Sequence, residues 1–267
     1  MIRAEEDGDV TFFRMARTLR GRPLYWTGAY LVDGWLLDCG PPATARELLH
    51  ALEGRPLEGL AITHHHEDHM GAAPLLVQAR GLRARIHAAG VPLLEHGFAQ
   101  ALYRRVAWGR PRRVKAEALG AELRTSRLRF QVVHTPGHSV DHVCFFEADR
   151  GWLFTGDLFL AERVRYLGPN EDVATLISSL ETVCALPLTR VFCAHRGPLA
   201  DGPAALRRKA DRLRSQRQQI LELLRQGLPE REVARRVVGR EGPLTWFSLG
   251  RFSARNFVSS VARGSRS

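Results

Sequence analysis

The chain has 267 residues and a mass of 29.9 kDa, with 45% hydrophobic and 25% charged residues. These values are ordinary for a soluble globular protein and exclude wholesale disorder, a collagen-like sequence and a fibre. No stretch approaches the ~18 uninterrupted apolar residues of a membrane span, and residues 1–13 lack the apolar run of a signal peptide. We therefore expect a cytoplasmic protein of one large domain or two, with no membrane partner.

The formal net charge of +11 is concentrated near the C-terminus. Residues 205–267 hold 15 Lys or Arg and 5 Asp or Glu, whereas residues 1–204 hold 24 and 23. A basic surface raises the local concentration of anionic partners. Almost all of the basic residues are Arg, however, a bias that the nucleotide composition of a genome also produces. We therefore keep two explanations of the charge, anion binding by the tail and compositional bias.

The four cysteines, at positions 39, 144, 184 and 193, form no metal-binding or disulfide pattern. Their spacings of 105, 40 and 9 residues contain no C-x-x-C motif. Each lies in an apolar stretch, where a free thiol behaves as a small buried hydrophobic group. We expect four reduced, structural thiols.

In the first half of the chain, short apolar runs alternate with Gly, Pro and Asp, a pattern typical of strands and turns. A two-residue hairpin turn is predicted at Asp33-Gly34. The other elements predicted here are, in chain order, a helix over 43–54, a buried strand over 59–63, a helix over 70–79, a strand leading to a helix over 83–90, and one helix over 91–105.

The second half begins with two further predicted hairpins, over 120–138 and 142–157. A helix with Asp172 as its N-cap follows, and a buried strand over 188–197 ends in a histidine. Strands paired by hairpins and interleaved with helices favour helix–sheet–sheet–helix layering.

Beyond Pro203 the sequence becomes helical and basic, and we place a boundary near residue 201. The prediction is a domain over 1–200 and a small basic helical domain over 201–267. One long helix is predicted to end at Gly227, a short one to occupy 229–239, and a third to begin after Ser253.

Four aromatic residues lie near the end of this tail. Such residues can stack nucleobases, each contributing ~1–3 kcal/mol, but more often they form the core of a small domain. We favour the core for Trp246, Phe247, Phe252 and Phe257.

The segment 63–71, at the end of a predicted buried strand, is rich in histidine and carboxylate groups. His64 and His66 lie two residues apart, and strand side chains two residues apart point the same way. Asp68 and His69 follow where the chain turns towards a helix. Imidazole and carboxylate together suit a borderline divalent ion such as zinc. A surface histidine run is the alternative, but such a run lacks the flanking strand and helix.

Three later segments each place a metal-capable side chain beside Gly at a strand end. They are Thr-Pro-Gly-His ending at His138, Thr-Gly-Asp ending at Asp157, and Ala-His-Arg-Gly containing His195. Loops at strand ends are where sites are usually assembled on a rigid scaffold.

The segment 64–69 has the pattern HxHxDH, and it is followed along the chain by His138, Asp157 and His195. This order of motifs resembles that of the metallo-beta-lactamase superfamily over roughly residues 25–200. LLDCG, with Asp38, is similar to that family's early acidic strand end. The resemblance implies an α/β fold, a four-layer αβ/βα sandwich with a dinuclear metal cleft along one edge. It implies two divalent ions, zinc or else iron or manganese, the first held by His64, His66 and His138, the second by Asp68, His69 and His195, with Asp157 bridging both.

This ligand set predicts hydrolysis. Two ions ~3.5–4 Å apart can share a hydroxide that attacks an electrophilic carbon or phosphorus, and they stabilise the oxyanion that develops. Asp68 is both a ligand and the residue placed to orient the nucleophile, so it is the predicted catalytic residue. Seven ligands exceed the four of a closed structural zinc site.

The remaining histidines are not predicted to bind metal. His65 should face away from its neighbours and serve packing or ligand orientation, and Glu67 is expected to be solvated. His142 is assigned equally to ligand orientation and to ordinary packing. We expect ordinary structural roles for His50, His87, His96 and His134.

Within the superfamily the chain is similar to glyoxalase II and to the lactamase-beta-like 2 group. The latter resemblance implies a winged-helix-like C-terminal domain. The predicted substrate is an ester or thioester with an anionic group, and the tail covers the cleft, binds nucleic acid or forms a homodimer interface. The residues predicted to meet the anionic group are Arg163, Arg165, Tyr166 and Arg196.

Three other functions are kept as alternatives. The first is a metal-dependent phosphodiesterase or endoribonuclease, with RNA as its partner. The second is a sulfur dioxygenase with one iron, since that group shares HxHxDH. The third is a DNA-binding regulator with an inactive metal site, which the complete ligand set disfavours.

Overall fold

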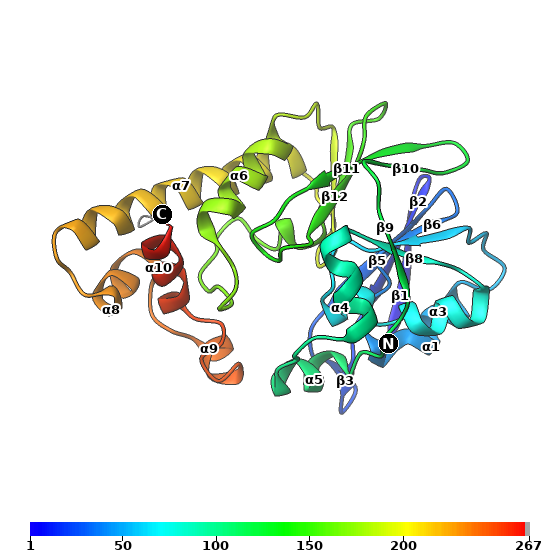
Figure 1. Cartoon of the computed structure of the whole chain (residues 1–267), viewed down its shortest axis with the longest axis horizontal. Coiled ribbons are helices and arrows are strands. Elements are labelled where there is room, and N and C mark those ends of the chain that lie inside the picture. The colour runs from blue at the N-terminus through cyan, green and yellow to red at the C-terminus, as the bar shows by residue number, and fades with distance from the viewer. Residues whose placement is uncertain (265–267) are drawn as a thin grey trace.

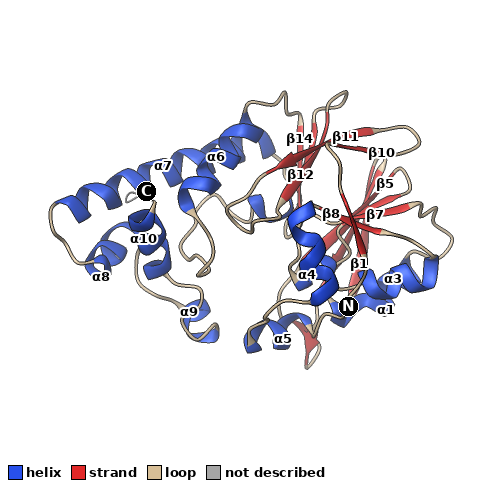
Figure 2. Ribbon diagram, in the orientation of Figure 1, coloured by secondary structure: helices blue, strands red, loops and turns tan. Residues whose placement is uncertain are grey.

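Two mixed β-sheets face each other and carry helices on their outer faces in the computed structural model, which describes residues 1–264 (Figures 1 and 2). The predicted helix–sheet–sheet–helix layering is confirmed. Among the described residues, no helix is both long enough and apolar enough to cross a bilayer.

The N-terminal sheet has seven strands. They are β1 (Ile2–Asp7), β2 (Val10–Met15), β5 (Thr27–Val32), β6 (Trp35–Leu37), β7 (Gly59–Ala61), β8 (Ala84–Ile86) and β9 (Ala116–Ala118), and a separate pair is formed by β3 (Thr18–Leu19) and β4 (Arg22–Pro23). Strands β1, β2, β5 and β6 pair antiparallel, and β6 to β9 pair parallel. The hairpin turn at Asp33-Gly34 is confirmed, because Val32 pairs with Trp35 and both turn residues have positive φ.

The second sheet has six strands. They are β10 (Glu122–Arg124), β11 (Arg129–His134), β12 (Val143–Glu147), β13 (Trp152–Phe154), β14 (Arg190–Cys193) and β15 (Gly197–Pro198). Both predicted hairpins are present, since β10 pairs with β11 and β12 with β13 in antiparallel fashion. The crossover from β13 to its parallel neighbour β14 contains a helix, as parallel pairing requires.

The helices fall into two groups. Beside the first sheet lie the 3-10 turns η1 (Pro42–Thr44) and η2 (Ala88–Gly90) and the helices α1 (Ala45–Ala51), α2 (Glu67–Met70), α3 (Ala73–Arg80), α4 (Val91–His96) and α5 (Leu102–Trp108). After β13 come the 3-10 turn η3 (Gly156–Leu158), α6 (Val173–Cys184), α7 (Gly202–Arg225), α8 (Glu230–Val233), the π-turn η4 (Ala234–Val238), α9 (Pro243–Phe247) and α10 (Ala254–Arg263).

Strand alternation explains how one sequence fills three core layers. Successive strand side chains point to opposite faces, so Phe12 packs between the two sheets while Phe13 packs against the helices outside the first sheet. Phe145 and Phe146 divide in the same way, with Phe146 in the core formed with α6 and α7. All four cysteines are free thiols, as predicted, and three of them are buried.

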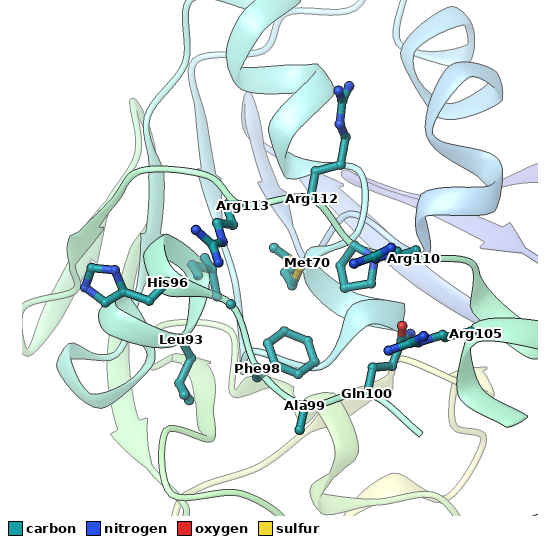
Figure 3. A pocket seen from close by; sticks show the side chains of 13 residues that line it. Met70, Leu93, His96, Phe98, Ala99, Gln100, Arg105, Arg110, Arg112 and Arg113 are labelled. Carbon is teal, nitrogen blue, oxygen red and sulfur yellow. The ribbon is translucent and has the colours of Figure 1, made fainter. Parts of the chain in front are cut away.

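One predicted helix is wrong. The single helix expected over 91–105 is two helices, because α4 ends at Gly97, whose φ is +85°. A left-handed conformation is easily adopted by Gly and ends a helix. The turn separates α4 from α5 and leaves a cavity between these helices and the loop that follows them (Figure 3).

The C-terminal helices share a continuous core with the second sheet. Leu206 of α7 and Phe257 of α10 belong to the same buried cluster as Leu153 of β13. The predicted N-caps are confirmed, since Asp172 and Ser253 accept hydrogen bonds from backbone N–H groups at the starts of α6 and α10. The boundary at residue 201 stays a prediction.

Two expectations for this region differ from the structure. No strand is assigned between α7 and α10 in the described chain, so the wing of a winged helix is not shown. Phe257 is buried as expected, but Trp246 is 77% exposed and Phe247 is 53% exposed. The prediction that they form a core is wrong, because α9 is only five residues long and has no buried residue.

A buried lysine joins α7 to the loop after β13. The Lys209 ammonium donates a hydrogen bond to the Leu158 carbonyl at 2.6 Å and lies over the Phe159 ring. Burial lowers the pKa of Lys209 to about 8, and nearby groups such as Glu171 only partly oppose this effect. The charged ammonium is therefore destabilising below that pH.

Because the pKa of Lys209 is lowered, we expect the free energy of unfolding to depend on pH. Between pH 8 and 10.5 the unfolded chain holds a proton that the folded Lys209 has released. The free energy of unfolding should therefore rise with pH across this window, by up to about 3 kcal/mol. Urea titrations of the wild type and Lys209→Met at several pH values test this, and an equal rise in both proteins would contradict it.

Candidate metal centre

All seven predicted ligands converge at one edge of the sandwich. The segments that carry them follow β7, β11, β13 and β14, whose ends meet there. The ligand atoms form two groups, and those of each group lie within 4.8 Å of one another. The groups are His64, His66, His138 and Asp157, and Asp68, His69, Asp157 and His195.

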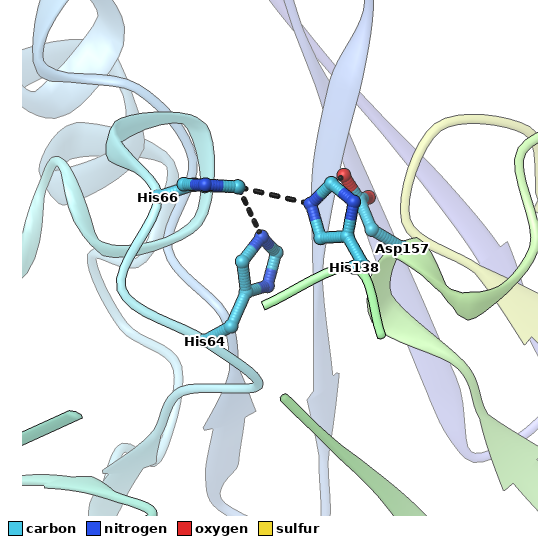
Figure 4. A group of neighbouring side chains, drawn as sticks. All are labelled: His64, His66, His138 and Asp157. Carbon is cyan, nitrogen blue, oxygen red and sulfur yellow. Dashed lines mark hydrogen bonds and ion pairs between the residues drawn. The ribbon is translucent and has the colours of Figure 1, made fainter. Parts of the chain in front are cut away.

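In the first group three imidazole nitrogens face one point (Figure 4). The Nδ1 atom of His66 lies 2.9 Å from Nε2 of His64 and 2.9 Å from Nε2 of His138. The Nε2 atom of His138 lies 3.2 Å from Oδ2 of Asp157.

The second group uses the other oxygen of the same carboxylate. Oδ1 of Asp157 lies 3.2 Å from Nε2 of His69 and 3.0 Å from Nε2 of His195. Oδ2 of Asp68 lies 3.8 Å and 3.6 Å from these two nitrogens. The Asp157 carboxylate thus presents one oxygen to each group.

Hydrogen bonds on the far side of the rings leave the converging nitrogens free. The Nδ1 atom of His69 lies 2.7 Å from Oδ2 of Asp38, and that of His138 lies 2.5 Å from Oε1 of Glu171. The Nδ1 atom of His195 lies 2.6 Å from the Trp26 carbonyl. These acceptors hold a proton on Nδ1, so the neutral form of each ring presents the Nε2 lone pair that a metal ligand needs.

The electrostatics of the site also suit a cation. Burial lowers the pKa of His64 and that of His66 well below the usual histidine value, so both rings are neutral. Burial also acts to lower the pKa of His69, but Asp157 and other nearby carboxylates outweigh it and raise that pKa well above the usual value. These carboxylates favour positive charge within the second group.

Two buried atoms give a direct test of the fit. Nε2 of His69 and Oδ1 of Asp157 lie 3.2 Å apart, but neither makes a hydrogen bond of acceptable geometry among the described residues. A buried polar atom without a partner costs about 1–3 kcal/mol, and a divalent ion would bind both atoms. The residues therefore fit a metal pair.

A buried ion pair also reaches the site from α5. Nε of Arg104 lies 2.5 Å from Oε1 of Glu67, and its Nη2 lies 3.0 Å from Oδ1 of Asp68. Glu67 is fully buried, so the expectation that it is solvated is wrong, because the cation of Arg104 balances its charge. Arg104 holds one oxygen of Asp68 and leaves the other facing the second group.

The remaining histidines divide by their partners. His65 faces away from the ligands and pairs with Asp141 at 2.8 Å. Nε2 of His142 accepts a hydrogen bond from the Asp157 backbone N–H at 3.0 Å, so this ring supports a ligand. His87 and His134 stack on each other, with ring centroids 4.2 Å apart.

The residues predicted to bind substrate have other contacts. Arg165 and Tyr166 both donate to the Arg240 carbonyl, and Arg196 donates to that of Leu160. Arg163 is exposed. Their role in substrate binding stays a prediction.

Glu171 and Arg104 were not predicted as site residues. Glu171 lies in a Pro-Asn-Glu-Asp loop and Arg104 in a Tyr-Arg-Arg-Val run, and neither pattern signals a metal site. Only the folded chain places these residues beside the ligands.

Glu171 provides a testable prediction. Its Oε1 orients His138, and its Oε2 accepts from the Gly168 backbone N–H at 2.5 Å. Glu171→Gln should weaken metal binding by about 10–100-fold, a range typical of groups that orient a ligand. Titration of the metal-free protein with zinc measures this, and Glu53→Gln, an exposed residue after α1, is the control. Equal zinc affinity in the two variants would show that Glu171 does not orient His138 for metal binding.

Known proteins share the motif pattern and the fold of this chain. Residues 29–195 match the Metallo-beta-lactamase superfamily. The hydroxyacylglutathione hydrolase of Albidiferax ferrireducens is 31% identical over 171 residues, which are 60% of this chain and 58% of that protein. The lactamase-like protein aptB of Emericella nidulans is 28% identical over 79% of this chain and 65% of its own length. The chain thus spans about three fifths of these curated relatives.

Solved structures share the fold. A metallo-beta-lactamase family protein of Thermus thermophilus superposes with a TM-score of 0.68 at 22% identity, covering 97% of this chain and 94% of that one. A protein solved in a di-iron-bound form is 30% identical, with a TM-score of 0.58, over 73% of this chain and 98% of its own. The family match covers more than half of the chain, including all seven convergent side chains, and the chain belongs to the metallo-beta-lactamase superfamily.

Proposed function

We propose that the protein is a dinuclear metal-dependent hydrolase of a thioester or ester that carries an anionic group, with zinc as the metal. One observation carries the proposal: the two oxygens of Asp157 each face a separate group of imidazoles. The first ion would be held by His64, His66 and His138, the second by Asp68, His69 and His195, and Asp157 would bridge both.

Each part of the site has a separate task. When bound, the ion pair supplies a water that is deprotonated near neutral pH and a Lewis acid for the substrate carbonyl. Asp68, held by Arg104 through Oδ1, orients the nucleophile with Oδ2. Asp38 and Glu171 hold His69 and His138 in the tautomer that ligation needs.

The cleft over the site suits a substrate with an apolar portion. A cavity of about 330 Å³ is lined by His66, His138 and Glu171, and also by Tyr103 and Phe252. The Tyr103 ring contacts Phe252 at a centroid distance of 6.4 Å and Phe247 at 5.8 Å. These aromatic rings bring α5 and the C-terminal region together beside the cleft.

A thioester is favoured because the hydroxyacylglutathione hydrolases among the relatives are named for thioester cleavage. Elemental analysis of protein purified without a tag or added metal is the first test. Close to two zinc ions per chain, with hydrolysis of glutathione or N-acetylcysteamine thioesters, is the expected result. A metal-loaded protein that cleaves no thioester or ester would overturn the proposal.

The same measurements separate the alternatives. One iron per chain with oxygen uptake on a persulfide would identify a sulfur dioxygenase. Cleavage of RNA with a steep loss of binding at high salt would identify a nuclease. The di-iron form of one relative is the reason to measure iron beside zinc.

A further inference from the structure

A second cavity, of about 340 Å³, lies beside the metal centre and is rich in arginine. It is open to solvent and is lined by α4, α5, the segment between them and the loop that follows α5. Its polar lining comes from Arg105, Arg110, Arg112, Arg113, His96 and Gln100 (Figure 3).

The positive charge of this cavity is not balanced. The lining contains no Asp or Glu, and among residues 1–264 none of its four guanidinium groups forms an ion pair. Some arginines elsewhere are paired, such as Arg208 with Glu162, Arg214 with Glu181 and Arg235 with Glu232. All four arginines of the cavity are exposed, and an anion bound among them would lower the repulsion between their like charges.

A buried acceptor in the cavity also lacks a partner. The Gln100 amide donates from Nε2 to the Gly109 carbonyl at 2.9 Å, which fixes its orientation. Its Oε1 is buried and has no hydrogen bond among the described residues. A hydroxyl or N–H of a bound ligand would satisfy this oxygen.

The arginine cavity adjoins the cleft over the metal centre. Leu93, Phe98 and Ala99 line both. The Phe98 ring contacts His65 at a centroid distance of 4.9 Å, and Met70, which lines the arginine cavity, ends the helix that carries Asp68. The two cavities are therefore neighbours, with Leu93, Phe98 and Ala99 between them.

We propose that the arginine cavity binds the phosphate groups of the substrate's carrier, so that the substrate is an acyl thioester of a phosphorylated carrier. The proposal rests on the thioester hydrolase function proposed above. Guanidinium groups match phosphate oxygens with paired N–H donors. Four of them suit several phosphate charges better than the one or two carboxylates of a peptide carrier. The proposed subsite lies among α4, α5 and the loop after α5, apart from the arginines that follow Asp157.

The test compares one acyl group on three carriers: coenzyme A, which is phosphorylated, glutathione, which has only carboxylates, and uncharged N-acetylcysteamine. The wild type should have a kcat/KM for the coenzyme A thioester at least about tenfold above that for the glutathione thioester. In Arg110→Ala/Arg113→Ala, the ratio of kcat/KM between the coenzyme A and N-acetylcysteamine thioesters should fall at least about tenfold, through KM.

The matched control is Arg231→Ala. This exposed arginine lies in α8, at the left end of the molecule in Figure 1 and well separated from α5, and its loss should leave the ratio unchanged. Metal content is measured in every variant. If the double variant still cleaves the thioesters with an unchanged ratio of kcat/KM between the coenzyme A and N-acetylcysteamine thioesters, the proposed phosphate subsite is wrong.

A binding measurement separates this inference from the proposed function. Adenosine 3′,5′-bisphosphate, titrated calorimetrically into the metal-loaded protein, should bind at least about tenfold more weakly to the double variant than to the wild type or Arg231→Ala. If no thioester is cleaved but this difference is found, the hydrolase proposal fails and the phosphate site stands. Equal binding in all three proteins overturns the phosphate site.

Discussion

Asp157→Ala should reduce kcat/KM for a thioester substrate by at least about 10³-fold, more than the loss of one transition-state hydrogen-bond donor. The variant removes both oxygens that face the two imidazole groups. His69 and His195 then lose the carboxylate that lies 3.2 and 3.0 Å from their Nε2 atoms. Metal bound per chain should fall with activity, while circular dichroism shows a folded protein.

The matched control for this variant is Asp149→Ala. Asp149 is an exposed aspartate in the turn between β12 and β13, so its loss removes the same chemical group without touching the site. We expect wild-type activity and metal content. Retained turnover in folded Asp157→Ala would show that this carboxylate does not bridge two ions.

Arg104→Met should lower the free energy of unfolding by about 3–5 kcal/mol. The substitution keeps a long side chain but leaves the fully buried Glu67 without its cation. One oxygen of Asp68 also loses its partner at 3.0 Å, so zinc affinity should fall as well. Urea denaturation of the metal-free protein measures the first effect and zinc titration the second.

Two further variants test whether the loss of stability comes from the ion pair between Arg104 and Glu67. Arg46→Met removes an exposed arginine from α1 and should change stability by no more than about 0.5 kcal/mol. Glu67→Gln combined with Arg104→Met removes the uncompensated charge and should recover part of the loss. A single variant as stable as the wild type would show that the ion pair contributes nothing to folding.

Local sequence predicted most elements and the seven side chains that converge in two groups. Short apolar runs separated by turn residues predicted the hairpins, and the turn at Asp33-Gly34 was predicted from its residue types. The histidines and aspartates of the four motifs were recognised because metal ligation restricts residue type and spacing within a few positions. The capping residues Asp172 and Ser253 were found for the same reason, since a cap acts on the backbone three residues away.

Contacts between distant segments could be read only from the folded chain. Arg104 meets Glu67 across 37 residues, and Glu171 meets His138 across 33. Neither residue type nor local pattern distinguishes such a partner from a solvated charge, so Glu67 was expected in water. The arginine cavity is another case, because Gly97 ends α4 and the chain changes direction before α5 begins at Leu102. Residue types and their spacing thus indicated which side chains could bind metal, whereas the fold set which charges hold them in place, because burial and pairing are properties of the packed chain.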